Sequence, residues 1–320
     1  MIAILMKNFS LQVFILLIVE LAIYSSFLLS KGINVRFIVP LTMMILAGSR
    51  LLIVLTAFTI SWVKRAPRPP LMQINFVQTL RLIVHEWIAM LILFLFLIPL
   101  ERWLGLRNPK DPKNQMKLPV LFIHGIFSNG GYWWALHRYL HQRQLTHLFT
   151  LNISPIFADI DSFAVEVKNR VEQICVETGA SQVILVGHSM GGLIARAYFH
   201  HHGGKERIAK IITLGSPHHG TFFAYWMGGK NIRQMRPNND WLNQLNALPS
   251  STVPTISIYS YHDDFIVPQD SSILPDATNI AIAGVGHLAM GFSKEFQQQV
   301  YQEIVKTDPH ESYLTHSRNN

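Results

Sequence analysis

A possible serine nucleophile lies in the second half of this 320-residue chain, in the Gly-x-Ser-x-Gly sequence of residues 187–191. An apolar run precedes Ser189, and a helical pattern that begins with small residues follows it. A serine becomes a nucleophile when a sharp strand-to-helix turn presents its hydroxyl to a base. Gly187 and Gly191 lack a Cβ, so they avoid the collisions that such a turn would otherwise cause. The spacing therefore predicts attack by Ser189 on an acyl group.

A base and an acid for this serine follow later in the chain, each directly after a short apolar run. A histidine accepts the proton of the serine and returns it to the leaving alcohol, while a carboxylate orients the imidazole. His287 is the expected base. We assign the acid to Asp264, because Asp-x-x-Val-Pro places that carboxylate at a turn while Val267 returns to the core. Asp263 remains the alternative acid.

Two loops offer backbone N–H donors for a developing oxyanion. The N–H of Met190 lies at the start of the helix that follows the serine. The glycine-rich segment 124–131 follows an expected strand at 118–123 and offers the N–H of Ile126. We expect the ring of His124 to orient this loop by hydrogen bonding. We also expect five side chains to contact the substrate: His124, Phe127, His188, His218 and Phe222.

The elements that must position these residues alternate between apolar runs and helical patterns after residue 118. Such alternation predicts an α/β fold with a mostly parallel sheet and helices on both faces, whose loops at the carboxyl strand ends form the site. Asp161 is expected to cap the helix that runs to about residue 178. The alternation breaks at about residues 221–250, where aromatic residues predict either a cap over an acyl-binding cleft or an ordinary packed helix pair.

The first third of the chain differs from the rest, because it holds apolar runs at about 9–29, 37–63 and 82–100. Each run is long enough to span a bilayer. We therefore predict a transmembrane region at 1–104, a polar linker at 105–117, a catalytic domain at 118–306 and a polar tail at 307–320. The runs contain ionisable residues, namely Glu20, Arg50, His85 and Glu86. We interpret them as structural pairs rather than as a transport path, and we expect Glu20 to pair with Arg50.

Composition narrows the possible partners. The formal net charge is +8. Residues up to Arg102 include nine Lys/Arg and three Asp/Glu, whereas the rest of the chain includes eighteen Lys/Arg and sixteen Asp/Glu. The basic excess therefore accompanies the membrane runs, which argues against nucleic-acid binding. Cys175 is the single cysteine, so neither an intrachain disulfide nor a cysteine metal site is possible. The adjacent His218 and His219 lack a carboxylate at ligand spacing, and we expect them to line the mouth of the site without a metal.

Orientation is inferred from the basic residues beside the runs. Three spans would place the N-terminus and the catalytic domain on opposite sides of the membrane. Lys64 and Arg65 lie tightly against the end of the second run, which favours a cytoplasmic N-terminus and an exported catalytic domain. We therefore expect an integral protein of a bacterial inner membrane with a periplasmic catalytic domain.

Together the motifs resemble the α/β-hydrolase superfamily and, within it, bacterial triacylglycerol lipases and related esterases. The resemblance covers about residues 118–305 and rests on these segments: His124–Ile126, Gly187–Gly192, Leu214–Thr221, Asp264–Pro268 and Gly286-His287. It implies ester hydrolysis without a cofactor, with Ile126 and Met190 as oxyanion donors. Membrane runs in place of a secretion signal favour a substrate in or near the bilayer.

The expected function is a membrane-anchored serine hydrolase that cleaves acyl esters of lipids through an acyl-enzyme on Ser189. Its expected partners are a lipid or acyl-ester substrate and the bilayer, and the sequence leaves any protein partner unknown. An acyltransferase or thioesterase on the same scaffold is one alternative. The other is a membrane transport or scaffold protein whose second domain only binds.

Overall fold

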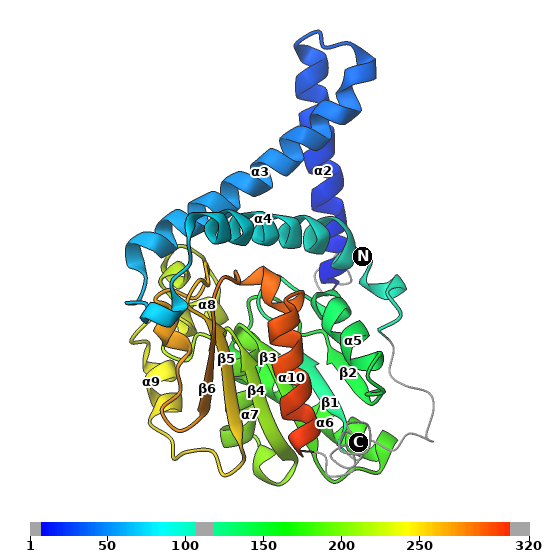
Figure 1. Cartoon of the computed structure of the whole chain (residues 1–320). Helices are drawn as coiled ribbons and strands as arrows, with labels where there is room; N and C mark the ends of the chain where they lie inside the picture. The colour runs from blue at the N-terminus through cyan, green and yellow to red at the C-terminus, as the bar shows by residue number, and fades with distance from the viewer. Residues whose placement is uncertain (1–7, 107–117, 308–320) are drawn as a thin grey trace, which may run out of the picture.

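One parallel sheet lies at the centre of the computed structural model, which describes residues 8–106 and 118–307. Its six strands have the spatial order β2-β1-β3-β4-β5-β6, and every neighbouring pair is parallel (Figure 1). In chain order the strands are β1 (Val120–Ile123), β2 (Leu148–Leu151), β3 (Val183–His188), β4 (Ile208–Leu214), β5 (Thr255–Ser260) and β6 (Thr278–Ile282). The predicted α/β sheet is therefore confirmed.

Helices cover both faces of this sheet, because side chains alternate between the faces along each strand. Leu121 and Leu185 point into the core under α6 (Ile160–Thr178) and α7 (Met190–His201). Phe122 and Val186 point into the opposite core with α5 (Trp134–His141) and α10 (Lys294–Thr307). Strands buried on both faces account for the near-continuous apolar runs in the sequence.

Three long apolar helices precede the sheet: α2 (Phe9–Ser30), α3 (Val35–Lys64) and α4 (Phe76–Ile92), the last of which continues as a π-helical segment, Leu93–Leu97. At the start of each helix, an asparagine side chain accepts a hydrogen bond from a backbone N–H group. These capping residues are Asn8, Asn34 and Asn75. Each apolar stretch is long enough to cross a membrane. The predicted apolar helices are thus confirmed, with shifted bounds.

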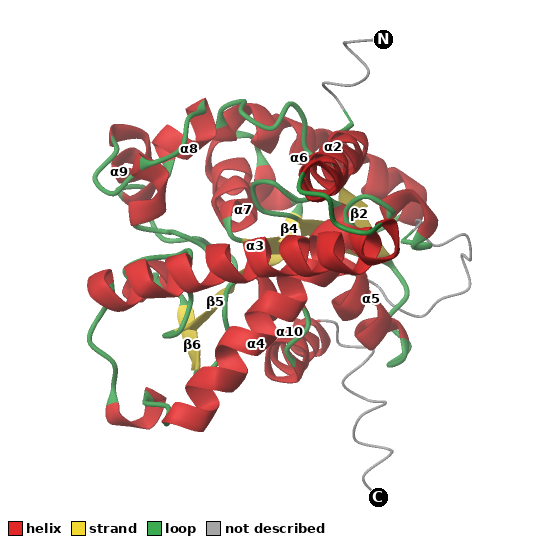
Figure 2. Cartoon of the chain, turned by 90° about the horizontal axis from the view of Figure 1, so that it is seen from above, coloured by secondary structure: helices red, strands yellow, loops and turns green. Residues whose placement is uncertain are grey.

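The helices α2 and α3 form a hairpin that projects from the sheet domain, and α4 crosses the carboxyl edge of the sheet (Figure 1). Seen from above, α3 and α4 lie over the strands while α2 is viewed end-on (Figure 2). Nη1 of Arg50 donates to Oε1 of Glu20 at 2.8 Å, and Nη2 of Arg50 contacts Oε2. The predicted pairing of these two residues is confirmed. Trp87 Nε1 joins α4 to α3 by donating to the carbonyl of Ala47 at 2.9 Å.

The segment after β4 contains two short helices, α8 (Lys230–Gln234) and α9 (Asp240–Asn246), after a 3-10 turn at Phe222–Tyr225. The N-cap predicted at Asp161 is wrong by two residues. The side chain of Asp159 accepts from the N–H of Ser162 at 2.9 Å, while Asp161 lies in the first turn of α6. Most of the predicted linker, residues 107–117, and all but the first residue of the predicted tail lie outside the described residues.

Candidate active site

Ser189 lies on a strained turn between β3 and α7, as the Gly-x-Ser-x-Gly spacing predicts. Its backbone has φ 55° and ψ −125°, a region that non-glycine residues rarely adopt. A Cβ on Gly187 would lie 2.5 Å from the carbonyl carbon of Gly191, and one on Gly191 would lie 2.1 Å from the carbonyl oxygen of Ile123. Both positions therefore exclude side chains, because the serine turn is pressed against β1 and against the start of its own helix.

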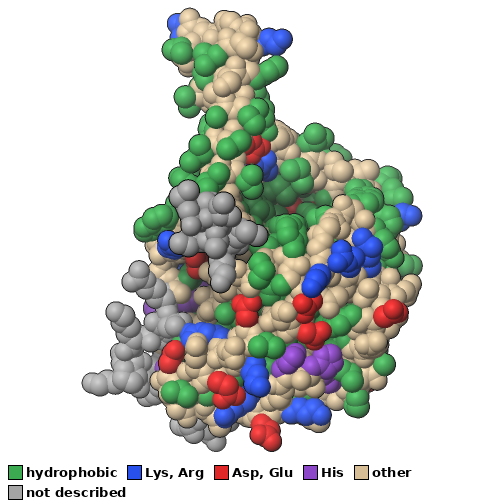
Figure 3. All heavy atoms as spheres, turned by 180° about the vertical axis from the view of Figure 1, so that it is seen from behind, with side chains coloured by type: hydrophobic (Ala, Val, Ile, Leu, Met, Phe, Trp, Pro, Cys, Tyr) green, Lys and Arg blue, Asp and Glu red, His purple; other side chains and the backbone are tan. Residues whose placement is uncertain are grey.

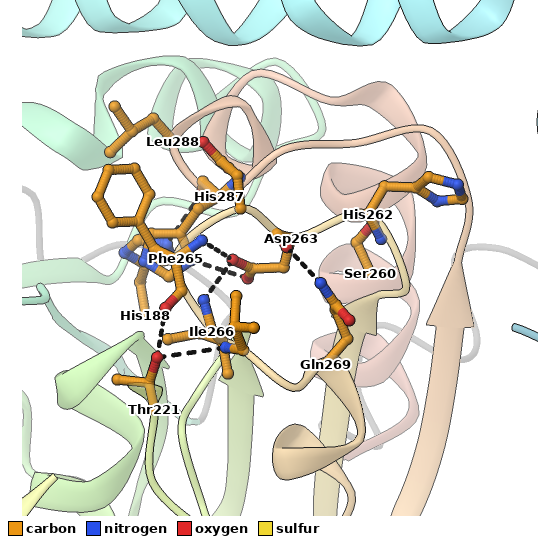
Figure 4. A network of polar contacts seen from close by, with 12 residues as sticks. His188, Thr221, Ser260, His262, Asp263, Phe265, Ile266, Gln269, His287 and Leu288 are labelled. Carbon is orange, nitrogen blue, oxygen red and sulfur yellow. Dashed lines mark hydrogen bonds and ion pairs between the residues drawn. The ribbon is translucent and has the colours of Figure 1, made fainter. Parts of the chain in front are cut away.

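The imidazole of His287 is held by Asp263, not by Asp264 as predicted. The Nδ1 atom of His287 lies 2.8 Å from Oδ2 of Asp263, and both side chains are buried (Figure 4). Asp264 instead accepts from the backbone N–H of His287, with its Oδ1 atom 3.0 Å away. The structure therefore pairs His287 with Asp263, the alternative left open by the sequence, and not with the expected Asp264.

The turn after β5 explains this exchange of roles. Oδ1 of Asp263 accepts the backbone N–H groups of Phe265 at 2.8 Å and Ile266 at 2.7 Å, which closes a tight turn over the carboxylate (Figure 4). The same geometry leaves Oδ2 directed at His287. Val267 does return to the core, as expected. The side chain that closes the turn is one residue earlier than the Asp-x-x-Val-Pro argument assumed.

The charges at this site favour a protonatable histidine. Burial lowers the pKa of His287, but the charge of Asp263 and its hydrogen bond outweigh burial, so the pKa is raised above its usual value. Burial, followed by the charge of Asp263, raises the pKa of Asp264 to about 8. Asp264 is therefore neutral at pH 7.

A buried carboxylate from α4 completes the setting of His287. Glu86 is fully buried, and its two oxygens accept the backbone N–H groups of Leu288 at 2.7 Å and Ala289 at 2.9 Å. A Cβ on Gly286 would lie 2.3 Å from Oε2 of Glu86, so a side chain there would displace this carboxyl group. Three successive N–H groups, from residues 287 to 289, are thus fixed by Asp264 and Glu86.

The two expected oxyanion donors lie on elements beside the serine. Met190 is the first residue of α7, and Ile126 lines the same cavity as Ser189. A Cβ on Gly125 would lie 2.8 Å from Cβ of Ser189, which shows how closely the 124–131 loop approaches the serine. His124 anchors this loop, since its Nε2 accepts from Ile153 N–H at 3.2 Å and its Nδ1 contacts the Gly125 carbonyl at 2.8 Å. Burial lowers the pKa of His124 to about 4, so the ring is neutral.

Ser189 and His287 open onto one apolar cavity of about 480 Å³. This volume lies within the range of small-molecule sites. Apolar side chains line the cavity from the N-terminal apolar helices and from the segment after β4: Val13, Leu16, Ile53, Met90, Leu93, Phe94, Phe223, Met227 and Met235. The Glu20–Arg50 pair also borders it.

Only two of the five side chains expected to contact substrate line this cavity, namely Phe127 and His188. His188 also stacks on Tyr132 at 4.1 Å, and its Nε2 contacts the carbonyl of His287.

The other three are corrected. His124 uses both ring nitrogens on the backbone. His218 is fully buried, with Nε2 3.1 Å from Oγ1 of Thr213, so it does not line the mouth. Phe222 turns its ring to Lys64, and the next residue, Phe223, lines the cavity instead.

Several site residues were missed by the sequence reasoning. Ser61 of α3 donates to the carbonyl of Asp263 at 2.9 Å. Gln269 donates to the same carbonyl at 2.7 Å (Figure 4). Glu86 was noted only as a charge for pairing within the membrane region. A buried acid in the middle of an apolar helix was the available signal, but it did not identify backbone N–H groups as the partners.

A possible metal-ligand group lies elsewhere, on α6 and α7. The ligand atoms of Asp161, His201 and His202 lie within 4.8 Å of one another. Asp161 also accepts from the indole N–H of Trp241 at 2.6 Å. None of these residues lines the cavity at Ser189.

Comparison with known proteins agrees with this fold. A family model described as the PGAP1-like alpha/beta domain matches residues 163–307. The lipase B of Aspergillus fumigatus has a similar structure, with a TM-score of 0.57 and 18% identity over 63% of this chain and 56% of that chain. This chain has the α/β-hydrolase fold. The predicted resemblance to lipases and esterases of that superfamily is thereby confirmed.

Two curated relatives match part of the sequence. A triacylglycerol lipase of Pseudarthrobacter phenanthrenivorans is 30% identical over 116 residues, which are 34% of this chain and 35% of the lipase. A GPI inositol-deacylase of Emericella nidulans is 26% identical over 144 residues, 39% of this chain and 12% of that protein. The chain thus spans about a third or less of the length of these relatives.

Proposed function

We propose that this chain is a membrane-anchored serine hydrolase that cleaves the acyl ester of a lipid bound in the cavity at Ser189. The observation that carries the proposal is the position of Ser189 and His287 on one apolar cavity whose walls come partly from membrane helices. The ion pair of His287 with Asp263 supports it. The relatives that cleave lipid esters by name agree with it.

The proposed reaction begins when Oγ of Ser189 attacks the ester carbonyl and His287 accepts the hydroxyl proton. The N–H groups of Ile126 and Met190 stabilise the oxyanion. The bond between the carbonyl carbon and the alcohol oxygen then breaks, and His287 returns the proton to the alcohol. Water next attacks the acyl-serine while His287 accepts a proton from the water. The bond between the acyl carbon and Oγ of Ser189 then breaks, His287 returns the proton to Oγ, and the fatty acid is released.

Asp263 contributes by fixing the imidazole and stabilising its protonated form. Because Nδ1 of His287 faces Asp263, Nε2 is the nitrogen left for the serine. The apolar walls provide the binding energy, since each buried methylene of an acyl chain contributes about 0.8 kcal/mol.

A fluorophosphonate probe tests the nucleophile directly. The full chain in detergent micelles should be labelled, and Ser189→Ala should lose labelling and the hydrolysis of p-nitrophenyl acyl esters together. Ser181→Ala is the matched control, because Ser181 is exposed at the opposite end of β3. Equal labelling of Ser189→Ala, or no labelling of a wild-type protein with a normal melting transition, would overturn the proposal in favour of a non-catalytic binding protein.

A further inference from the structure

Both ends of the α2–α3 hairpin contact the sheet domain. At the start of α2, Nδ2 of Asn129 donates to Oγ of Ser10 at 2.9 Å. At the end of α3, Ser61 donates to the carbonyl of Asp263, and the N–H of Ala66 donates to Oε1 of Gln269 at 3.2 Å. The beginning of α2 and the end of α3 must therefore lie on the side of the membrane that holds the sheet domain.

The opposite end of the hairpin projects away from that domain, and it turns at residues 31–34 (Figure 1). Hydrophobic side chains cover the hairpin, with Lys or Arg side chains at its tip (Figure 3). Exposed examples on its two helices include Leu16 (66%), Ile23 (60%) and Val39 (69%). From Ser10 to Ser30 the helix rises by about 30 Å, the thickness of the hydrocarbon core of a bilayer.

The third apolar helix has a different setting, because it is attached to the sheet domain before its start, near its middle and after its end. Before its start, Nε of Arg68 donates to the carbonyl of Tyr261 at 3.0 Å. Near its middle, Glu86 accepts the N–H groups of residues 288 and 289. Just after its end, Asn129 donates to the carbonyl of Ile98 at 2.9 Å. A helix held at both ends by one domain cannot carry the chain across a bilayer.

The two faces of α4 agree with this position. Leu82, Glu86 and Ala89 are buried against the protein. The opposite face is apolar and exposed, with Phe76 at 83%, Val77 at 56%, Leu80 at 54% and Ile88 at 43%. An apolar face of this kind is suited to the membrane surface, parallel to the bilayer plane.

We propose that only α2 and α3 cross the bilayer, and that α4 lies at the membrane surface over the sheet domain. The start of α2, the connection between α3 and α4, and the sheet domain then share one side. That side holds basic residues near the helix ends, including Lys64, Arg65, Arg68 and Arg81. The tip of the hairpin, on the other side, holds Lys31 and Arg36. The positive-inside rule makes that side the cytoplasm. This inference does not depend on the proposed enzyme activity, and it replaces the expected three spans and exported domain.

Single cysteines distinguish the two topologies. Cys175 is buried and is first replaced in Cys175→Ala. Ser30→Cys, Gln73→Cys and Ser181→Cys are then introduced separately at exposed positions. Intact cells and permeabilised cells are treated with a membrane-impermeant maleimide. We expect labelling of residue 30 in intact cells, and labelling of residues 73 and 181 only after permeabilisation.

The three-span arrangement gives a different pattern, because residues 30 and 181 would share a side and residue 73 would lie opposite. That pattern would overturn the proposal. Labelling of residues 73 and 181 in intact cells, with residue 30 protected, would overturn the cytoplasmic assignment. Each variant is accepted only if its melting temperature in detergent lies within about 3 °C of the Cys175→Ala protein.

Discussion

Replacing Asp263 with asparagine tests the central assignment of the site, because it distinguishes two adjacent carboxylates. The buried Oδ2 atom of Asp263 lies 2.8 Å from Nδ1 of His287. An amide at this position loses the charge that stabilises the imidazolium and can present an N–H group to Nδ1, which favours the wrong tautomer. In a serine protease the same change lowers kcat by about 10⁴, or roughly 5 kcal/mol. We expect a loss of the same order for Asp263→Asn.

Asp264→Asn is the matched control, one residue away. Asp264 accepts the backbone N–H of His287, and the amide oxygen of asparagine can do the same. Its pKa of about 8 leaves Asp264 protonated at pH 7, so the substitution removes little negative charge. We expect kcat to fall by less than about tenfold, which is less than 1.4 kcal/mol.

The assay is hydrolysis of p-nitrophenyl esters by full-length protein in detergent, with kcat and KM measured separately. Folding is checked by the melting temperature and by retention of the protein in solution. If Asp264→Asn lost about 10⁴ in kcat while Asp263→Asn stayed within tenfold of wild type, the ion pair with His287 would not be the functional one. The reasoning from the turn after β5 would then be refuted.

Four further predictions concern the surroundings of this pair. Because only neutral His287 can accept a proton, kcat/KM should fall tenfold per pH unit below its raised pKa; a flat profile from pH 5 to 8 would contradict this. Asp264→Asn should raise the melting temperature more at pH 7 than at pH 5. The pKa of Asp264 is raised in the folded protein, so its carboxyl group makes the folded protein less stable as pH rises from about 4 to 8. An equal effect of the substitution at both pH values would argue against a neutral Asp264. Glu86→Gln should leave one buried N–H group, of Leu288 or Ala289, unpaired and lower the free energy of unfolding by about 1–3 kcal/mol, measured by urea denaturation; an unchanged value would contradict the cap on that turn. Met227→Trp should fill part of the cavity and lower kcat/KM about fourfold for each methylene of the acyl chain that it displaces from the cavity. The measurement is kcat/KM for a series of esters of increasing acyl chain length. Equal losses for short and long chains would place the acyl group elsewhere.

The sheet could be predicted from sequence because local patterns determine it. Apolar runs such as residues 183–186 alternate with helical patterns, and a parallel arrangement follows from that alternation. Gly187 also has a local cause, because a Cβ there would meet Gly191 in the helix that follows. The serine and histidine positions could therefore be read from short segments and from the order of the strands.

The choice between Asp263 and Asp264 could not be read in this way. Adjacent side chains leave the backbone in different directions, and the outcome depends on which carboxylate closes the turn onto Phe265 and Ile266. That closure is a matter of backbone dihedrals rather than of residue type. His218 was misplaced for a related reason, since the chain after β4 turns its side chain inward towards Thr213.

The placement of the three N-terminal apolar helices could not be predicted from the sequence. Length and hydropathy identified three helices but could not distinguish a span from a helix that lies on a protein surface. Glu86 marks the difference, because its partners are N–H groups of a loop two hundred residues away. Partners of this kind place Glu86 against the sheet domain, which supports the proposal that α4 lies on that domain.

The structural contacts also argue against treating the first hundred residues as a separable anchor. Ser61 of α3 holds the carbonyl of Asp263, and Glu86 of α4 holds the turn that follows His287. Each of these bonds fixes the main chain beside one member of the proposed catalytic pair. The same helices supply apolar walls to the cavity. The helices proposed to attach the chain to the membrane therefore also hold the geometry of the site, so a loss of α3 or α4 would disturb the His287–Asp263 pair as well as the apolar wall of the cavity.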